Sequence, residues 1–185
     1  RQLVGLAGGL KGRGHDVAVA VFYGEGALEK GVRGAGVPVR HLGKKGRWDI
    51  AGFIWRLVRH VRRERPDVLY GFLVDSNVLA AALKSLIPRV KVVWGVRASN
   101  MDLRRYDWLA RAMFRISVRL SRFADLIVFN STARMEFHME QGFPKGKGLV
   151  IPNGTDVGRF RPDPESRARV REEWGLGNGK ALVGI

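Results

Sequence analysis

The stretch IAGFIWRLVRHVRRERPDVLYGFLVDSNVLAAALKSL, residues 50–86, decides the fold. Its first part, Ile50 to Arg65, places apolar residues three and four positions apart, as in an amphipathic helix, and Pro66 ends that helix. Val68 to Phe72 is an apolar run typical of a buried strand, and the alanine- and leucine-rich Asn77 to Leu86 predicts a second helix. This helix–strand–helix order indicates parallel strands joined by helices.

The same alternation extends in both directions along the chain. The further strands are expected at Asp16 to Phe22, Val37 to Leu42, Lys91 to Val96, Leu126 to Phe129 and Leu149 to Ile151. The further helices are expected at residues 3–10, Ala27 to Arg33, Tyr106 to Phe123 and Thr132 to Gln141. We therefore predict an α/β fold with a Rossmann-like, doubly wound parallel sheet that helices cover on both faces.

The two ends of the chain suggest a domain division. The first predicted element is a helix, whereas such sheets normally begin with a strand and a glycine-rich turn, so we expect the first strand to be missing. Near the other end, Pro152 to Gly154 predicts a turn and Arg161 to Pro164 an extended linker. We expect a domain over residues 1–158, a linker with a short helix over 159–180, and the first strand of a second domain over 181–185.

The composition limits the possible functions. There are 33 Lys and Arg against 17 Asp and Glu, a net charge of +16, which implies partners that carry negative charge, with phosphate as the common group. The chain has no cysteine, so disulfides and cysteine-based zinc sites are excluded. No apolar run approaches the roughly 18 residues of a membrane-spanning helix, so the expected chain is soluble or lies on a membrane surface.

Polar residues just after the predicted strands are the candidate site residues, because ligands of parallel α/β sheets bind at the carboxyl ends of the strands. They are Asp75, Asn77, Arg97, Ser99, Asn100, Asn130, Ser131, Asn153 and Gly154. Residues 75–77 and 130–131 also suit a helix N-cap, and residues 153–154 a turn with positive φ. The mixed polar segment after Val96 is as well suited to line a site as to form an ordinary loop.

Four motifs, in this order, connect the chain with a known family. They are L-K-G-R-G-H-D-V at Leu10 to Val17, R-P-D-V-L-Y at Arg65 to Tyr70, A-D-L-I-V-F-N-S at Ala124 to Ser131, and V-I-P-N-G-T-D at Val150 to Asp156 with Phe160 after it. Together they resemble the GT4 glycosyltransferases, which are retaining enzymes of the GT-B fold. The resemblance spans essentially the whole chain.

The resemblance implies two Rossmann-like domains that face each other across a cleft, with the acceptor held mainly by the first and the nucleotide-sugar mainly by the second. On this basis the chain is the acceptor half. The expected acceptor-binding residues are Asp75, Asn77, Arg97, Ser99 and Asn100, and the residues expected to face the donor and the cleft are Asn130, Ser131, Asn153 and Gly154.

The catalytic residues are not identified by the sequence. Many family members carry a histidine after the strand that here ends at Val96, whereas this chain has Arg97, whose permanent charge suits binding better than proton transfer. The family's paired glutamates are expected beyond Ile185, so this segment alone is expected to be inactive. There is no Asp-x-Asp motif, and His15, His41, His60 and His138 fit no metal-ligand spacing, so neither a metal nor another cofactor is expected.

The expected function is transfer of a sugar from a nucleotide-sugar to a glycan or lipid-linked acceptor, with retention of configuration, in cell-surface polysaccharide or glycolipid biosynthesis. The alternatives are a non-catalytic nucleotide- or sugar-binding Rossmann domain and a basic nucleic-acid-binding module. The specific signatures of the latter are missing, so no nucleic acid is expected.

Two predicted helices carry many arginines, which suit either a solvated outer face or an anionic membrane surface. These arginines are Arg56, Arg59, Arg62 and Arg63 on one, and Arg104, Arg105, Arg111, Arg115, Arg119 and Arg122 on the other. Trp48 and Trp55 lie beside the first. The expected location is cytoplasmic, with peripheral binding to the inner face of the cell membrane as a further expectation.

Overall fold

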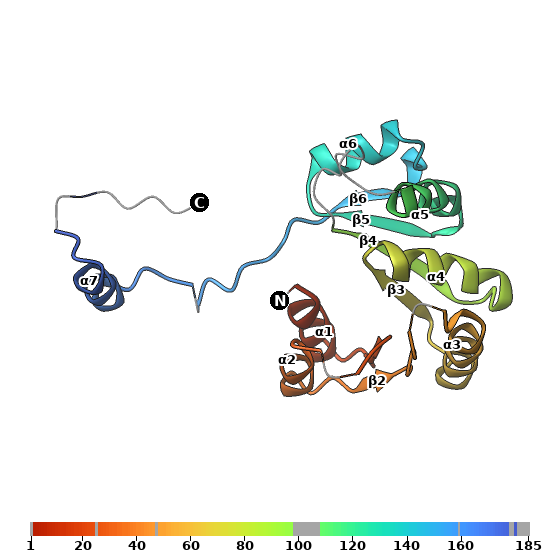
Figure 1. The fold of residues 1–185 in the computed structure, drawn as a ribbon, viewed down its shortest axis with the longest axis horizontal. Coiled ribbons are helices and arrows are strands. Elements are labelled where there is room, and N and C mark those ends of the chain that lie inside the picture. Colours follow the sequence, from red (N-terminus) through yellow and green to blue (C-terminus); the bar gives the residue numbers. More distant parts are fainter. Residues whose placement is uncertain are drawn as a thin grey trace. The chain divides into compact units, whose positions relative to one another are not determined.

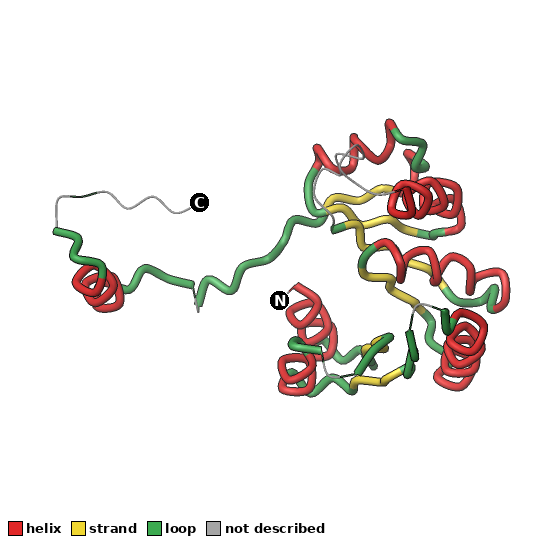
Figure 2. Tube along the Cα trace, in the orientation of Figure 1, coloured by secondary structure: helices red, strands yellow, loops and turns green. Residues whose placement is uncertain are grey.

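The computed structural model describes residues 2–24, 26–46, 48–97, 108–158, 160–177 and 180. The chain divides into two compact units, residues 1–153 and 154–185, and each is described by itself. In the first unit helices and strands alternate along the chain, as the ribbon in Figure 1 and the tube in Figure 2 show.

The larger sheet has four parallel strands in the order β3, β4, β5 and β6. They are β3 (Val68–Phe72), β4 (Lys91–Val96), β5 (Leu126–Phe129) and β6 (Gly148–Val150). The register pairs Tyr70 with Val93, Trp94 with Ile127 and Phe129 with Val150. The predictions for β3, β4 and β5 are confirmed residue for residue, and β6 begins and ends one residue earlier than predicted.

The smaller sheet has two parallel strands, β1 (Val19–Val21) and β2 (Val39–His41). Both are shorter than predicted, because β1 has a neighbour along one edge only and fewer residues are held in the ladder. In Rossmann-like sheets the first strand lies between the strands that correspond to β1 and β3. No strand of the described residues lies between β1 and β3. One edge of β1 and one edge of β3 therefore have no described partner strand.

The helices follow the predicted alternation. They are α1 (Gln2–Gly12), α2 (Glu29–Gly34), α3 (Ile50–Glu64), α4 (Val74–Leu86), α5 (Trp108–Leu120), α6 (Thr132–Glu140) and α7 (Pro164–Glu173). Short 3-10 turns follow at Ser121–Phe123 and Lys145–Lys147. Residues 106–107, the predicted start of the fifth helix, lie outside the described residues. The prediction for α4 is wrong at its start, which comes three residues earlier than expected.

Three apolar clusters hold the first unit together. Around β4 and β5, Trp94, Ile127 and Phe129 are 0–1% exposed and pack with α4 and residues of α5. A second cluster joins α3, through Phe53 and Leu57, to residues next to both sheets. A third joins α1 and α2 to β1 and β2. Because side chains alternate between the faces of a strand, the second and third clusters cover opposite faces of the smaller sheet. The predicted α/β fold with parallel strands between helices is confirmed.

The second unit contains the short helix that was predicted within 159–180. The Asp163 carboxylate caps α7 by accepting a hydrogen bond from the Ser166 N–H at 3.0 Å, with Pro164 at the first helical position. Arg171 is only 7% exposed, and its guanidinium donates to the carbonyl oxygens of Gly177 and Lys180. The strand expected over residues 181–185 lies outside the described residues.

Candidate functional site

The carboxyl edge of the larger sheet brings together polar residues from three successive strand–helix turns. Arg97 follows β4 directly, Asn130 follows β5 directly, and Asn153 comes three residues after β6. All three were predicted site residues. Since parallel strands end at one edge, these positions become neighbours although more than fifty residues separate the first from the last.

Arg97 is held in place on two sides. Its guanidinium carbon lies 5.0 Å from the ring centroid of Phe72, and its Nη1 donates a hydrogen bond to Asn153 Oδ1. The side chain is only partly exposed. The structure therefore joins two predicted site residues in one contact, while their roles in binding stay predictions.

Arg134, in the first turn of α6, is a member of this edge that the sequence reasoning missed. Its Nη1 donates to the backbone oxygen of Arg97 at 3.2 Å and to Asn130 Oδ1. Acidic residues are favoured in the first turn of a helix, where the helix dipole is positive, so an arginine there is an unfavourable placement. That placement, directly after a predicted site turn, is the signal that could have identified it.

Ser131 caps α6, as predicted. Its hydroxyl accepts a hydrogen bond from the Arg134 N–H at 3.4 Å. Gly154 belongs to the second unit, and Ser99 and Asn100 lie outside the described residues. The predicted role of Ser99 and Asn100 in acceptor binding, and that of Gly154 in facing the cleft, therefore stay predictions.

The prediction that residues 75–77 cap a helix is wrong, because they lie inside α4. Leu73 occupies the cap position instead, with φ +82° and ψ 166°, and its carbonyl oxygen accepts from the Asn77 N–H at 3.0 Å. This combination of positive φ and extended ψ is populated almost only by glycine, so Leu73 is strained. Asn77 is 2% exposed, and its Nδ2 donates to the Gly95 carbonyl oxygen at 3.3 Å, which ties α4 to β4.

Gly71 allows α4 to begin this close to the sheet. A Cβ atom at this position would lie 2.8 Å from Asn77 Cα and 2.9 Å from its backbone nitrogen, too short for any real contact. Glycine is thus required at residue 71, and the first turn of α4 is fixed against β3.

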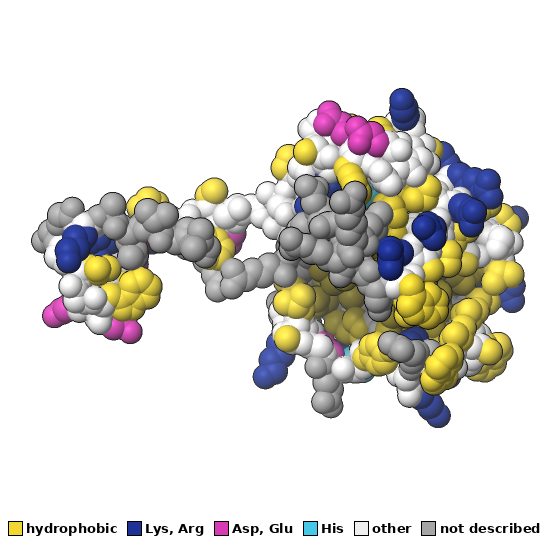
Figure 3. Space-filling view, turned by 45° about the horizontal axis from the view of Figure 1, so that its top comes forward, with side chains coloured by type: hydrophobic (Ala, Val, Ile, Leu, Met, Phe, Trp, Pro, Cys, Tyr) yellow, Lys and Arg dark blue, Asp and Glu magenta, His cyan; other side chains and the backbone are white. Residues whose placement is uncertain are grey.

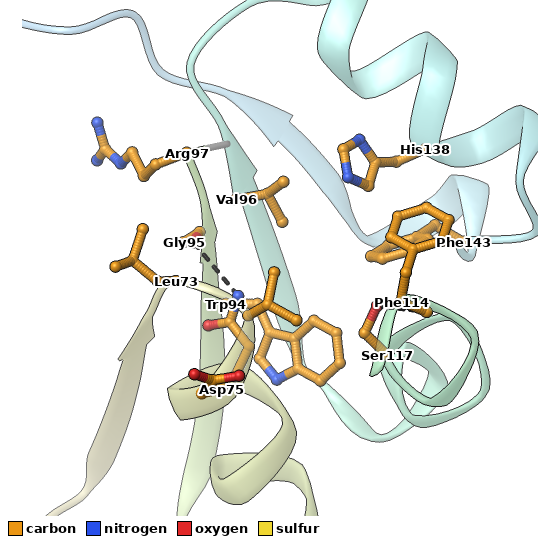
Figure 4. A pocket seen from close by; sticks show the side chains of 12 residues that line it. Leu73, Asp75, Trp94, Gly95, Val96, Arg97, Phe114, Ser117, His138 and Phe143 are labelled. Carbon is orange, nitrogen blue, oxygen red and sulfur yellow. Dashed lines mark hydrogen bonds between the residues drawn. The ribbon is translucent and has the colours of Figure 1, made fainter. Parts of the chain in front are cut away.

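A cavity of about 210 Å³ lies beside the ends of β3 and β4 (Figure 4). Its wall includes Asp75, Trp94, Ser117 and His138, and Arg97 extends away from the aromatic side chains at its rim. The dashed line in Figure 4 marks the bond from Asn77 to Gly95. Among the described residues, Trp94 Nε1 and Asn77 Oδ1 are buried without a hydrogen-bond partner.

His138 is a packing residue rather than a site base. It is 6% exposed and contacts the rings of Phe114, Phe129 and Phe143 at centroid distances of 4.9–5.8 Å. Burial lowers its pKa, and the neutral ring is positioned by a hydrogen bond between Nδ1 and the Arg134 carbonyl oxygen at 2.9 Å. Within the described ranges no three histidine, aspartate or glutamate side chains gather as metal ligands.

The outer faces of α3 and α5 differ from this edge, because most of their arginines are exposed. Arg56 is the exception, since it is partly buried and forms an ion pair with Asp49. The predicted Arg104 and Arg105 lie outside the described residues. Figure 3 shows Lys and Arg side chains on one face with hydrophobic side chains between them. The three tryptophans in or next to these two helices are also exposed, Trp48 at 87%, Trp55 at 62% and Trp108 at 74%. In the part of the chain that the structure describes, no helix is long and apolar enough to cross a membrane.

A family model, described as the glycosyl transferase 4-like domain, matches residues 1–154. The chain belongs to this glycosyltransferase family, GT4. The match covers the whole first unit, including Arg97, Arg134 and Asn153.

Two mycobacterial proteins are similar to this GT4 chain. A GDP-mannose-dependent alpha-(1-6)-phosphatidylinositol monomannoside mannosyltransferase of Mycolicibacterium smegmatis is 39% identical over 152 residues, which are 70% of this chain and 37% of that protein. A GDP-mannose-dependent alpha-mannosyltransferase of Mycobacterium tuberculosis is 30% identical over 161 residues, 85% of this chain and 42% of that protein. The chain thus spans about two fifths of the length of these relatives.

Solved structures show the same fold. The Anabaena protein Alr3699/HepE in complex with UDP-glucose has a TM-score of 0.78 at 21% identity, over 96% of this chain and 46% of that one. A Rickettsia africae glycosyltransferase has a TM-score of 0.65 at 15% identity, over 96% of this chain and 46% of that one. These likenesses place the GT4 chain in a Rossmann-like half of the GT-B fold.

Proposed function

We propose that the complete protein transfers a sugar from a nucleotide-sugar to a glycan or lipid-linked acceptor, with retention of configuration, and that this chain forms the acceptor side of its cleft. The observation that carries the proposal is the family match over residues 1–154. The polar edge formed by Arg97, Arg134 and Asn153 supports it, because parallel α/β sheets bind ligands at this edge.

The chemistry suits a site of fixed positive charge. The bond from the anomeric carbon to the diphosphate breaks with its electrons on the diphosphate, and the acceptor hydroxyl oxygen bonds to that carbon and passes its proton to an oxygen of the departing diphosphate. Positioned cations and N–H donors stabilise the departing diphosphate. We propose that Arg97 binds rather than exchanges protons, together with Asp75, Ser99 and Asn100, and that no metal is needed. Asn77 is proposed only as a support for the cavity wall, since it is buried.

GDP-mannose is the first donor to test, because the names of both mycobacterial relatives specify it. One of those names also specifies a phosphatidylinositol mannoside, so a lipid-linked acceptor in glycolipid synthesis is the first acceptor class to test. Because the chain spans about two fifths of these relatives, turnover is proposed for the complete protein and not for this segment alone.

Calorimetry with the complete protein tests this function. GDP-mannose and UDP-glucose are titrated separately, and we expect one of them to bind with a micromolar dissociation constant. If no nucleotide-sugar binds, the transferase proposal is wrong. Binding without transfer to any acceptor would favour the non-catalytic alternative, and tight duplex or single-strand binding at physiological salt would favour the nucleic-acid module.

We also propose that the protein binds the cytoplasmic face of an anionic membrane through the outer faces of α3 and α5. The exposed tryptophans beside exposed arginines support this, since each basic residue near such a surface contributes about 1 kcal/mol. In vesicle sedimentation, replacing Arg111, Arg115 and Arg119 by Gln is expected to lower binding to phosphatidylserine vesicles roughly a hundredfold. Equal binding to neutral and anionic vesicles at low salt would show that these arginines are only a solvated outer face.

A further inference from the structure

We propose that Arg97 and Arg134 together form a subsite for a phosphoryl group at the carboxyl edge of β4 and β5. The identity of the biological ligand, a donor diphosphate or the phosphate of a lipid-linked acceptor, rests on the proposed function. The subsite itself is defined by contacts within the first unit, so it can be tested without measuring sugar transfer.

The first argument is that both guanidinium groups are positioned before any ligand arrives. Arg97 lies over Phe72 and donates to Asn153, and Arg134 donates to Asn130 and to the carbonyl oxygen of Arg97. That last contact, at 3.2 Å, links the two residues directly. Most flexible arginines lose side-chain entropy on binding, and this pair has already lost much of it.

The second argument is that no carboxylate in the described part of the chain neutralises the two positive charges. Within the described ranges, every acceptor of these guanidinium groups is the neutral oxygen of an amide or a carbonyl group. Among the described residues no carboxylate forms an ion pair with either arginine. The start of α6, where Arg134 lies, adds the positive end of a helix dipole.

The third argument concerns the charge of the ligand. A guanidinium has five N–H donors in a planar fork, and the bonds given above use only one nitrogen of each arginine. Two adjacent guanidinium groups match the two or more negative charges and several oxygens of a phosphoryl group better than a single carboxylate. Hence the ligand class is a phosphate or diphosphate ester.

The test is calorimetry of the 185-residue chain with inorganic pyrophosphate at constant ionic strength. The variants are Arg97→Gln and Arg134→Gln, and the matched control is Arg89→Gln, which removes one positive charge from the exposed turn before β4, at the amino end of the sheet. We expect each edge variant to weaken binding at least tenfold and the control to change it less than twofold. Arg134→Lys, which keeps the charge but loses the fork, is expected to restore affinity only in part.

Two results would overturn the subsite. One is an equal loss of affinity in Arg89→Gln, which would show that the net charge alone attracts pyrophosphate. The other is unchanged binding in both edge variants, with folding of every variant checked by circular dichroism. Even if Arg97→Gln does not fold, the comparison of Arg134→Gln with Arg89→Gln decides the outcome.

The same variants identify the source of the phosphoryl group. A loss for GDP with no loss for glycerol phosphate indicates the donor diphosphate, and the reverse indicates an acceptor phosphate. If the variants lose affinity for neither GDP nor glycerol phosphate, the subsite is contradicted. Failure of the complete protein to bind any nucleotide-sugar would reject the proposed function, while the pyrophosphate result in this chain would still stand.

Discussion

The two ends of the four-stranded sheet differ in whether a described carboxylate pairs with their positively charged side chains. At the amino end, the Asp125 carboxylate accepts hydrogen bonds from Lys84 Nζ and, at 2.7 Å, from the Val92 N–H, and Lys91 Nζ lies 3.9 Å away. At the carboxyl end, Arg97 and Arg134 have only neutral acceptors among the described residues.

We infer from this difference that the charged groups at the amino end stabilise the fold, whereas the arginines at the carboxyl end remain able to bind an anionic ligand. At the amino end the Asp125 carboxylate pairs with Lys84, lies near Lys91, and joins α4 to two strands. The carboxyl end has groups that are positioned yet not neutralised, next to a strained Leu73 and a cavity. Such features gather where a protein binds ligands, at some cost to stability.

The largest effect is expected at Gly71, which lets α4 begin against the carboxyl end of β3. Gly71→Ala would drive a Cβ atom into the backbone of Asn77, so we expect a loss of about 2–3 kcal/mol in the free energy of unfolding. Urea unfolding followed by circular dichroism measures it. In the control Gly9→Ala, in α1, no atom lies within 4 Å of the new Cβ, and a gain of about 0.5–1 kcal/mol is expected. Similar losses in both would mean that the close approach is not what holds α4.

The next effect contrasts the two ends directly. Asp125→Asn leaves Lys84 without its carboxylate, and we expect a loss of about 1–2 kcal/mol in stability. Arg134→Gln removes one of two uncompensated charges and is expected to change stability by less than about 0.5 kcal/mol. Both are measured by urea unfolding. A larger loss of stability in Arg134→Gln than in Asp125→Asn would show that the carboxyl end, and not the amino end, uses its charge to hold the fold.

A smaller gain is expected from relieving strain at the carboxyl end. Leu73 is 56% exposed, so Leu73→Gly loses little apolar burial while it removes the unfavourable φ, and we expect about 1 kcal/mol of stabilisation. Arg65, with φ 49° in the ordinary left-handed region, is the control, and Arg65→Gly should gain about half as much or less. Thermal unfolding in a calorimeter distinguishes them, and destabilisation of Leu73→Gly would show that the side chain contributes more than its strain costs.

The smallest effect is a pH dependence at the amino end. Burial alone would raise the pKa of Asp125, but hydrogen bonds from Lys84 and Val92 outweigh it and hold that pKa below its ordinary value. A depressed pKa stabilises the fold above the unfolded pKa of about 3.9, and this contribution is lost as the pH falls through the lower folded value. The stability difference between the wild type and Asp125→Asn should therefore narrow as the pH falls from 6 toward about 2.5. A stability difference that stays constant over this pH range would contradict the stabilising role of the ionised Asp125 carboxylate.

The sequence predicts the sheet well and the site only in part. The strands β3, β4 and β5 are continuous apolar runs, and α3 has a regular apolar stripe, so local pattern is sufficient for them. The start of α4 was missed because Asp75 to Asn77 has the composition of a cap, whereas Gly71 and the strained Leu73 decide where the helix begins.

Arg97 was found because it follows a strand directly, which is a local feature. Arg134 was missed because its importance comes from a contact with a residue 37 positions earlier, which only the folded sheet creates. The positions of most helices and strands can be predicted from residues that are neighbours in sequence. The pairing of Arg97 with Arg134 cannot, because the two residues meet only in the folded sheet.

Transfer by the complete protein tests the account most directly. Labelled GDP-mannose and UDP-glucose are incubated separately with the protein and a glycolipid extract, and product and released nucleoside diphosphate are measured together. We expect acceptor-dependent transfer from one donor, with the anomeric configuration retained and with at least a tenfold loss in Arg134→Gln but not in Arg89→Gln. Absence of both binding and transfer with every nucleotide-sugar would contradict the account.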